Sequence, residues 1–496
     1  MTDYKSEVRD SVIHNLEAKV AKGSYGQYLK RLTLRKVRGF VDREVSFDFP
    51  VTALVGSNGG GKTTVLGAAA LAYASVLPGR FFAKSGKYDA SMLDWSIEYE
   101  LIEKRLSTRL PVARTASFKK SKWSRKAVER EVLVFGVERT LPATERAKPK
   151  KARSTKFTAV KGARLPAEVT EYAARILGKP IEGFLQLDVD PSGRVTMFSG
   201  VTRKGELYSE FHFGAGEASA IRIVAEVEAA GDGALILIEE IENGLHPIAT
   251  RRMVEYLIGV ARRKSCQVVF TTHSNDALAP LPSSAIWAAY GGNVLQGKLD
   301  VKALRTITGQ INAQLAIFVE DAFAEIMVTT ALRIHGGVEM DAIKVHGMGG
   351  AQPAMDVNAQ HAQDPTATFP SVCLLDGDQA HQADPARGIL VLPGTTYPEA
   401  HVFERVLERL DELAAKLTVS LLLPTNQRDR VARVVRDRAL SNIDRHVIWE
   451  QIGEDLDFTS AHTVTSAFLA TWAQAYPTEV NKMVEDLGDR IPRREA

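Results

Sequence analysis

Hydrophobic positions in the first part of the chain recur with two different periods. Apolar and polar residues alternate around 32–34 and 45–47, which is typical of half-buried strands, and the apolar run at 51–55 predicts a buried strand. A glycine-rich turn separates that strand from small apolar residues at 64–74, which predict a helix. An amphipathic pattern at 6–20 predicts a short helix ahead of the first strand.

Beyond residue 166, predicted helices and strands follow one another in turn. Helices are expected at 166–177, 216–230 and 247–263, and buried strands at 234–239 and 266–272. This alternation predicts a mainly parallel sheet flanked by helices. The preceding segment, from about 105 to 165, shows no sustained period and is expected to be an insert.

A second α/β pattern begins near residue 314. Strands are expected in the segments AIFVE, IKVHGMGG, SVCLLDGD and GILVLPG, with a helix in DAFAEIMVTTALRIHG. From about 399 onward the pattern is helical, with three amphipathic segments. We therefore predict an α/β protein in three parts: a head at 1–312, a smaller α/β domain at 313–400, and a helical extension at 401–496.

Composition changes the predicted fold little, but it indicates where in the cell we expect the protein. The chain has 496 residues, 45% hydrophobic and 25% charged, which is typical of a globular protein. No apolar run has the length of a membrane span, and the charged N-terminus does not resemble a secretory signal. Cys266 and Cys373 lie in apolar, strand-like runs and are expected to be buried free thiols. We therefore expect a cytoplasmic protein with no membrane partner.

Charge is distributed unevenly although the net charge is only +3. Residues 110–165 contain sixteen Lys or Arg and four Glu, which gives this segment a charge of +12. Such a segment can be a solvated insert, or a surface that contacts the phosphate backbone of nucleic acid. Charge alone leaves both interpretations open.

The motif GSNGGGKT at 56–63 predicts a nucleotide site, because it matches GxxxxGK[ST] between a predicted strand and a predicted helix. Its glycines let backbone N–H groups surround the phosphates of ATP. Lys62 supplies a positive charge and Thr63 a hydroxyl ligand for Mg²⁺. The predicted nucleotide-binding positions here are Ser57, Asn58, Gly59, Gly60, Gly61, Lys62, Thr63 and Thr64.

Two carboxylates and a histidine follow the next buried strands. Glu239 and Glu240 end the strand at 234–239, and a P-loop enzyme needs one acid for the Mg²⁺ water shell and another to orient the attacking water. His273 ends the following strand, where a neutral imidazole can contact the γ-phosphate. Their order behind the phosphate loop favours a catalytic function for all three.

Over residues 28–310 these motifs resemble the ABC ATPase superfamily and, within it, the SMC-like and OLD-family heads. GSNGGGKTT resembles Walker A, and LILIEE resembles Walker B, with Glu239 as the metal acid and Glu240 as the catalytic base. NGLH at 243–246 resembles the D-loop and His273 the switch histidine. The resemblance implies ATP and Mg²⁺ as cofactors. It also implies a homodimer or larger oligomer in which two heads sandwich the nucleotide.

Two further segments resemble conserved segments of such heads, and the second of them differs from the family pattern at one position. Arg38 resembles the early basic residue of such heads, and FGAGEAS at 213–219 stands where the ABC signature is expected. Gly214, Gly216 and Glu217 are therefore predicted nucleotide-binding positions. Gly214 replaces the usual signature serine, as Glu239 replaces the usual Walker B aspartate, so we expect slow turnover that suits a switch. Backbone N–H groups at the start of the following helix could still bind the anion.

The segments AIFVEDAFAEIMV and VCLLDGDQ resemble the Toprim domain of OLD-family nucleases. On that resemblance Glu320, Asp376 and Asp378 would bind Mg²⁺ or Mn²⁺, with Glu325 one helical turn further on. Clustered carboxylates at neighbouring strand ends suit such a site.

Whether that site cleaves nucleic acid stays open at this stage. Glu399 and Glu404 could supply further acids, but the family also uses a lysine and residues 379–415 contain none. Arg387 is an imperfect substitute.

The combination of head and Toprim-like domain resembles bacterial anti-phage defence ATPases such as those of the Septu and PARIS systems. It implies an ATP-dependent switch that controls nucleic-acid cleavage, with an effector nuclease or toxin as partner and the basic segment as a possible nucleic-acid contact. Two alternatives remain: an OLD-type nuclease with its own metal site, and an SMC-like DNA-repair ATPase. The lack of a long coiled-coil repeat counts against the second alternative.

Overall fold

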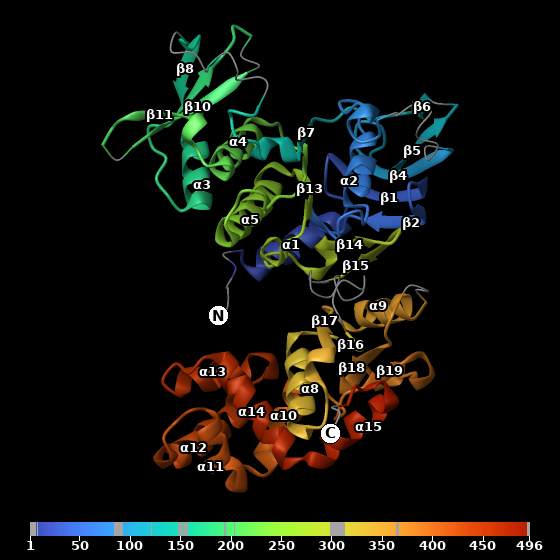
Figure 1. Cartoon of the computed structure of the whole chain (residues 1–496), viewed down its shortest axis with the longest axis vertical. Helices are drawn as coiled ribbons and strands as arrows, with labels where there is room; N and C mark the ends of the chain where they lie inside the picture. Colours follow the sequence, from blue (N-terminus) through green and yellow to red (C-terminus); the bar gives the residue numbers. More distant parts are fainter. Residues whose placement is uncertain are drawn as a thin grey trace. The chain divides into compact units, whose positions relative to one another are not determined.

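The structure is a computed structural model that divides into two compact units, residues 1–296 and 297–496 (Figure 1). It describes the chain except for residues 1–5, 7, 84–92, 121, 147–151, 153–156, 193–194, 203, 298–312, 364–366 and 494–496. The domain boundary expected after residue 312 therefore lies outside the described residues. In the described ranges no helix is both long and apolar enough to cross a membrane. Cys266 and Cys373 are buried free thiols, as expected.

The first unit is built around a six-stranded sheet in the order β15-β14-β3-β13-β12-β7. All neighbours are parallel except the β14–β15 hairpin, so the expected mainly parallel sheet is present. The strands are β3 (Val51–Val55), β7 (Val132–Phe135), β12 (Leu235–Ile238), β13 (Gln267–Thr272), β14 (Ile286–Tyr290) and β15 (Asn293–Gln296). Strands β3, β12, β13 and β14 are buried throughout, which explains why their residues are mostly apolar.

The described residues of this unit form six α-helices, most of which are labelled in Figure 1. They are α1 (Asp10–Ala21), α2 (Lys62–Leu71), α3 (Ala167–Leu177), α4 (Ala215–Ala229), α5 (Pro247–Lys264) and α6 (Asn275–Leu278). Helix α5 shows how sequence sets the boundaries, because Pro247 occupies its first turn and three basic residues its last. It ends where Ser265 adopts the left-handed conformation, with φ of 51°.

Two antiparallel sheets complete the unit, in the orders β2-β1-β4-β5-β6 and β11-β10-β9-β8. The first contains β1 (Gln27–Val37), β2 (Phe40–Ser46), β4 (Trp95–Glu103), β5 (Val112–Lys119) and β6 (Lys122–Arg125). The second contains β8 (Lys161–Arg164), β9 (Leu185–Asp188), β10 (Thr196–Val201) and β11 (Leu207–Ser209). The sequence pattern had predicted the early strands but neither of these sheets.

The prediction of an irregular basic insert is wrong for much of the segment. It supplies β5 to the antiparallel sheet, where Ala116 and Phe118 face the core while Lys119 is exposed. It also supplies β7, which pairs in parallel with β12 about a hundred residues further along the chain. The high charge obscured these strands, because only one face of each contributes to the core. Residues 147–151 and 153–156 of the segment lie outside the described residues.

The second unit contains a four-stranded parallel sheet in the order β17-β16-β18-β19. Its strands are β16 (Leu315–Val319), β17 (Ile343–Gly347), β18 (Ser371–Leu375) and β19 (Ile389–Val391), with helices α8 (Ala322–His335) and α9 (Ala351–Gln363) between them. From β16 the chain continues to one edge of the sheet, and from β18 to the other edge. The carboxyl ends of β16 and β18 therefore meet at a topological switch point, where open α/β sheets bind ligands.

Six α-helices follow the sheet, where three amphipathic segments were expected. They are α10 (Pro398–Glu408), α11 (Leu410–Ser420), α12 (Arg428–Ser441), α13 (Ile448–Asp455), α14 (Ala461–Ala475) and α15 (Pro477–Leu487). Left-handed residues interrupt the helical pattern in two of the breaks, at Leu422 after α11 and at Asp457 and Phe458 after α13. Strands and helices of this unit share one hydrophobic core, in which Phe323 of α8 stacks on Trp449 of α13 at 5.6 Å.

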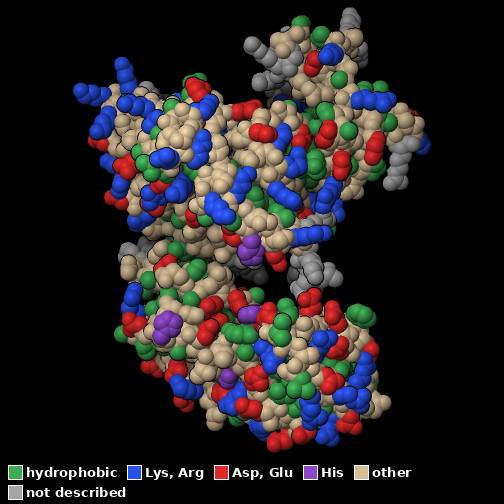
Figure 2. Space-filling model, turned by 180° about the vertical axis from the view of Figure 1, so that it is seen from behind, with side chains coloured by type: hydrophobic (Ala, Val, Ile, Leu, Met, Phe, Trp, Pro, Cys, Tyr) green, Lys and Arg blue, Asp and Glu red, His purple; other side chains and the backbone are tan. Residues whose placement is uncertain are grey.

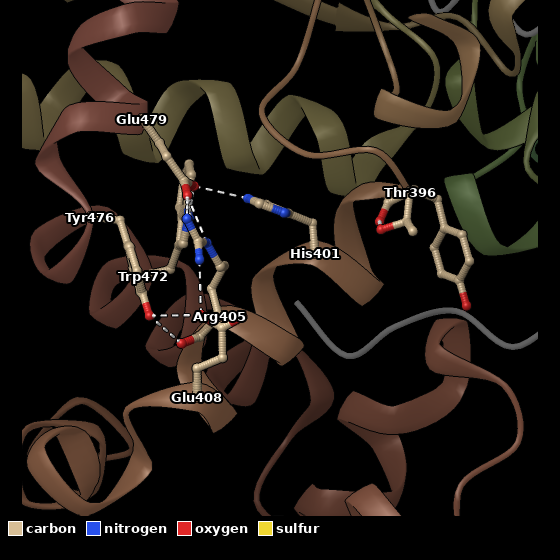
Figure 3. A network of polar contacts seen from close by, with 8 residues as sticks. Thr396, His401, Arg405, Glu408, Trp472, Tyr476 and Glu479 are labelled. Atoms are coloured by element: carbon tan, nitrogen blue, oxygen red, sulfur yellow. Dashed lines mark hydrogen bonds and ion pairs between the residues drawn. The ribbon is translucent and has the colours of Figure 1, made fainter.

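A polar network around Glu479 joins α10, α14 and α15 (Figure 3). Its carboxylate accepts hydrogen bonds from Trp472 Nε1 (2.8 Å) and Arg405 Nε (2.7 Å), and pairs with His401 Nε2 at 2.9 Å. These partners outweigh the effect of burial and hold the pKa of Glu479 at about 2. The network fixes the last helices against α10, which begins beside the carboxyl ends of the sheet.

Candidate functional site

The predicted phosphate-binding loop connects β3 to α2. Its glycines are needed for space, because a Cβ on Gly60 would lie 2.5 Å from the carbonyl oxygen of Ala289. Lys62 donates its ammonium hydrogens to the carbonyls of Gly56 (2.9 Å) and Ser57 (3.0 Å), so the chain curls around the lysine head. Backbone curvature, the start of a helix and this cation together suit a polyphosphate.

Burial lowers the pKa of Lys62 to about 8, although Glu240 and Glu242 partly offset this effect. Its side chain is nearly inaccessible, at 7% exposure. A buried ammonium with backbone carbonyl partners gains more from a phosphate anion than an exposed lysine would, because less water must be displaced.

Glu239 and Thr63 meet at the metal side of the predicted site. Thr63, Val137 and Glu239 line the same cavity. Burial raises the pKa of Glu239, and the neighbouring Glu138 and Glu240 carboxylates add to the rise. The Thr63 side chain and the Val137 backbone lower the pKa of Glu239 and partly offset this rise. Hydroxyl and carboxylate oxygens are the ligands that Mg²⁺ uses in this setting, so these residues fit a nucleotide-bound Mg²⁺.

Glu240, the predicted catalytic base, is held in a sharp turn. Its backbone is left-handed, with φ of 47°, which is uncommon for a residue with a side chain. The Glu240 N–H donates to Thr271 Oγ1 (2.8 Å), and its carboxylate accepts from Asn243 Nδ2 (2.5 Å). The turn therefore orients a carboxylate that can polarise a water molecule opposite the phosphates.

Arg139 fixes this turn, and the sequence did not reveal it. It lies in the 3-10 helix Val137–Thr140 that follows β7, and it is 7% exposed. Its guanidinium donates to the carbonyls of Glu239 (2.5 Å), Glu240 (2.6 Å) and Gly136 (3.0 Å). One buried cation from the basic segment thus holds the backbone of both predicted acids.

Glu242 is a second residue that sequence reasoning missed. Its carboxylate accepts hydrogen bonds from Thr272 Oγ1 (2.8 Å) and from the backbone N–H of His273 (2.6 Å). Because Glu242 lies two residues after Glu240, it ties the segment that follows β12 to the end of β13. The only signal in the sequence was a third acid in IEEIEN.

Most of the predicted nucleotide-site residues line one cavity of about 640 Å³, a volume suited to a nucleotide. The predicted residues that line it are Arg38, Asn58, Gly59, Gly60, Gly61, Lys62, Thr63, Thr64, Glu239, Glu240 and His273. Arg38 also donates to the Thr64 hydroxyl at 2.8 Å. Ser57 is absent from the lining and contributes its carbonyl to Lys62 instead.

Gly214, Gly216 and Glu217 lie outside this cavity. They form the start of α4, where Gly214 is the N-cap and Glu217 pairs with Lys179 at 2.6 Å. Gly216 touches the turn after the acidic pair, since a Cβ there would lie 1.7 Å from the carbonyl oxygen of Gly244. The segment that resembles the signature therefore packs against the segment that resembles the D-loop.

In the second unit, the predicted Toprim acids gather at the switch point of the sheet. Glu320 follows β16 and accepts a hydrogen bond from the backbone N–H of Asp376, which follows β18, at 2.8 Å. Glu399, at the start of α10, adds a buried carboxylate that pairs with His446 at 3.1 Å. Asp378 is exposed. Glu325 accepts a hydrogen bond from the backbone N–H of Gly347 at 3.1 Å.

The Asp376 carboxyl is 7% exposed, and burial raises its pKa to about 8, with the carboxylates of Glu320, Asp321, Glu399 and Asp378 adding to the rise. Burial likewise raises the pKa of Glu320. Within the described ranges, however, no three His, Cys, Asp or Glu side chains are arranged as a metal-binding group. Glu404 pairs with Arg445 at 2.9 Å, and Arg387 is exposed.

Two family models match the first unit. One, an AAA domain, matches residues 31–131, and the other, "AAA domain, putative AbiEii toxin, Type IV TA system", matches residues 170–279. Together they span the phosphate loop, the acidic pair and His273. No curated protein matches the chain.

Three solved structures are similar to a little over half of the chain. The SMC head domain from Thermotoga maritima is 12% identical, with 55% of this chain and 99% of that chain covered and a TM-score of 0.34. The Smc head domain with an extended coiled coil, bound to a ScpA domain and derived from Pyrococcus furiosus, is 10% identical, with 57% and 99% covered and a TM-score of 0.38. The recombination mediator RecF with ATP is 11% identical, with 55% and 98% covered and a TM-score of 0.34.

The phosphate loop and the acidic pair lie within the two AAA-domain matches, so the first unit carries the residues of a P-loop ATPase. Proteins of this class bind ATP with Mg²⁺ and hydrolyse it. In this chain Lys62 and the loop N–H groups would hold the phosphates, Thr63 and Glu239 the metal, and Glu240 the attacking water.

Proposed function

We propose that the chain is an ATP-binding, slowly hydrolysing switch subunit in anti-phage defence. It controls nucleic-acid cleavage by scaffolding or gating an effector nuclease or toxin. The main observation in support of this proposal is that Lys62, Glu240 and His273 line the same cavity. The description of the model matched at residues 170–279 names a putative toxin of a toxin–antitoxin system, which supports a link to systems of that kind.

Slow turnover follows from the start of α4. Gly214 caps this helix without a side-chain hydrogen bond, so this position offers no hydroxyl to a γ-phosphate. Backbone N–H groups remain for anion binding. An ATPase that binds tightly and hydrolyses slowly stays long in its ATP state, which suits a switch more than a motor.

Two heads would sandwich the nucleotide, giving a homodimer or larger oligomer. Gly214 and Gly216 lie outside their own chain's cavity, which supports a role opposite the cavity of another copy. The test is light scattering of Glu240→Gln with and without ATP. ATP-dependent doubling of mass supports the sandwich, and a monomer at saturating ATP contradicts it.

We assign the second unit a Toprim-like fold with a regulatory or degenerate site. The paired strand ends at Glu320 and Asp376 support the fold, and the lack of a lysine in residues 379–415 supports the degenerate site. An OLD-type nuclease is the alternative. Manganese-dependent cleavage by the purified chain, lost in Asp376→Ala with ATP hydrolysis intact, would establish that alternative.

The basic hairpin β5–β6 is the proposed nucleic-acid contact. Figure 2 shows Lys and Arg side chains gathered on the part of the first unit that holds these strands, and Lys119, Lys120, Lys122 and Lys126 are exposed. Arg125 has another role, because its guanidinium donates to the carbonyls of Leu71, Tyr73 and Val76.

The test reverses the four exposed lysines and leaves Arg125 in place. Weaker binding of DNA or RNA, with a smaller dependence on salt, supports the contact. Unchanged binding would leave a solvated hairpin. Binding confined to DNA ends or junctions would favour the remaining alternative, an SMC-like repair ATPase.

A further inference from the structure

The first unit has a second cavity of about 560 Å³ that shares no lining residue with the nucleotide site. It lies between α1, α3 and α5, which lie near one another in Figure 1. Hydrogen bonds attach the N-terminal segment and α1 to the α5 side: Ser6 donates to Glu255 (2.9 Å), and Lys19 donates to Ser265 (2.7 Å).

The lining of this cavity is strongly cationic. Six basic side chains face one carboxylate, that of Glu255, which already accepts the hydrogen bond from Ser6. The basic residues are Arg9, Lys19, Arg175, Arg252, Arg262 and Arg263. So many like charges around one hollow repel one another unless an anion offsets them.

Some of these cations already have partners and others remain available. Arg263 pairs with Glu228 at 2.8 Å. Arg252 donates to the backbone carbonyl of Arg175 at 3.1 Å, and no carboxylate of the described residues pairs with it. Among the described residues, Arg9 and Arg262 have no carboxylate partner. The available charge therefore lies along one side of the cavity, on the start of α1 and on α5.

The remaining lining is aromatic and aliphatic. Tyr172 and Tyr256 lie with ring centroids 5.1 Å apart, and the Arg263 guanidinium covers the Tyr172 ring at 5.0 Å. Ile176 and Ile258, both buried, add aliphatic surface. Aromatic surface beside guanidinium groups that lack a carboxylate partner among the described residues suits a ligand with a flat ring and a phosphate.

We propose that this cavity is a second ligand site, which binds a nucleoside phosphate. The phosphate contacts Arg252 and Arg262, with Arg9 at the entrance, and the base lies against Tyr172. Helix α5 connects this cavity to the nucleotide site. Helix α5 begins directly after the D-loop-like turn, and its Arg251 pairs with Asp276, three residues beyond His273.

The test uses the full chain carrying Lys62→Ala, which removes the phosphate-loop cation, and measures AMP and pyrophosphate binding by calorimetry. AMP should bind, and Arg252→Ala with Arg262→Ala should weaken it at least tenfold. Arg164→Ala, an exposed arginine on β8, is the matched control and should have no effect. With Lys62 restored, the Arg252→Ala, Arg262→Ala chain should still bind ATP, which shows that the unit is folded.

Three outcomes would overturn the proposal. Absence of AMP binding, or binding that is indifferent to the two arginines, removes the site. Pyrophosphate binding as tight as AMP binding reduces it to an inorganic-anion site. Binding of a single-stranded oligonucleotide that depends on Arg252 and Arg262, without AMP binding, makes it a nucleic-acid contact instead.

Discussion

Replacing Arg139 by alanine should slow ATP hydrolysis while leaving ATP bound. The guanidinium is buried and donates to the carbonyls of Glu239 and Glu240 at 2.5 and 2.6 Å. Without it, those carbonyls lose their partner and the left-handed turn at Glu240 can relax. The phosphates should be affected little, because Lys62 and the loop do not contact Arg139.

The magnitude follows from these contacts. A hydrogen bond to a charged group contributes roughly 1.5–3 kcal/mol, so the two bonds to the acidic pair stabilise the turn by about 3–6 kcal/mol. A left-handed residue with a side chain costs on the order of 1–3 kcal/mol, which these bonds offset. If losing this stabilisation raises the activation free energy of hydrolysis by ~2 kcal/mol, kcat falls roughly 30-fold.

Arg130 provides the matched control. It is equally buried, at 5% exposure, and donates to the Gly233 carbonyl (2.8 Å), to Tyr73 Oη (2.8 Å) and to Gln267 Oε1 (3.1 Å). It lies at the opposite end of β12 from the acidic pair. Arg130→Ala should therefore lower thermal stability as much as Arg139→Ala and leave kcat per folded molecule unchanged.

The assay combines phosphate release, ATP calorimetry and thermal unfolding for both variants. The expected result for Arg139→Ala is a lower kcat with an ATP affinity within a few-fold of wild type. Equal kcat losses in Arg139→Ala and Arg130→Ala, after correction for folded protein, would refute a positioning role and leave Arg139 a purely structural residue.

Three further predictions address the two sites. Lys62→Ala should weaken ATP binding roughly 100-fold or more in calorimetry, because the loop loses its only side-chain cation; wild-type affinity would remove the nucleotide assignment. Glu240→Gln should retain ATP and hydrolyse it about 100-fold more slowly in a phosphate-release assay; the same effect in Glu239→Gln alone would exchange the two roles. Asp376→Asn should stabilise the second unit at neutral pH. The raised pKa of Asp376, about 8, means that folding must protonate this carboxyl, so wild-type stability from this group falls as pH rises from about 4 to 8. The gain in Asp376→Asn should therefore grow from near zero at about pH 4 to several kcal/mol at pH 8, and a gain in thermal stability that is independent of pH would contradict the linkage.

Local motifs explain why much of the head could be predicted. The phosphate loop, the acids after β12 and His273 are each contiguous with a buried strand, so sequence alone placed them at strand ends. Parallel strands bring such ends to one edge of a sheet, and the structure has them lining one cavity.

Other parts depend on partners far away in sequence. Strand β7 has four residues inside a highly charged segment and becomes recognisable only through its pairing with β12. Arg139 follows from that pairing, because only the register of β7 brings its guanidinium to the turn. The six helices after the sheet were undercounted because short breaks such as that at Leu422 leave the apolar period nearly intact.

The backbone approach between Gly216 and Gly244 has a consequence for how sequence variation is tolerated. Any side chain at Gly216 would have to push the D-loop-like turn away by more than an ångström, and Gly244, with φ of 77°, is the corresponding constraint on the other side. In a saturation library selected for function, both positions should therefore be depleted of every substitution, alanine included. Because the backbones of these two segments are in contact, we expect a displacement of the start of α4 to displace the D-loop-like turn as well. The two segments should therefore move together when a head meets a neighbouring copy.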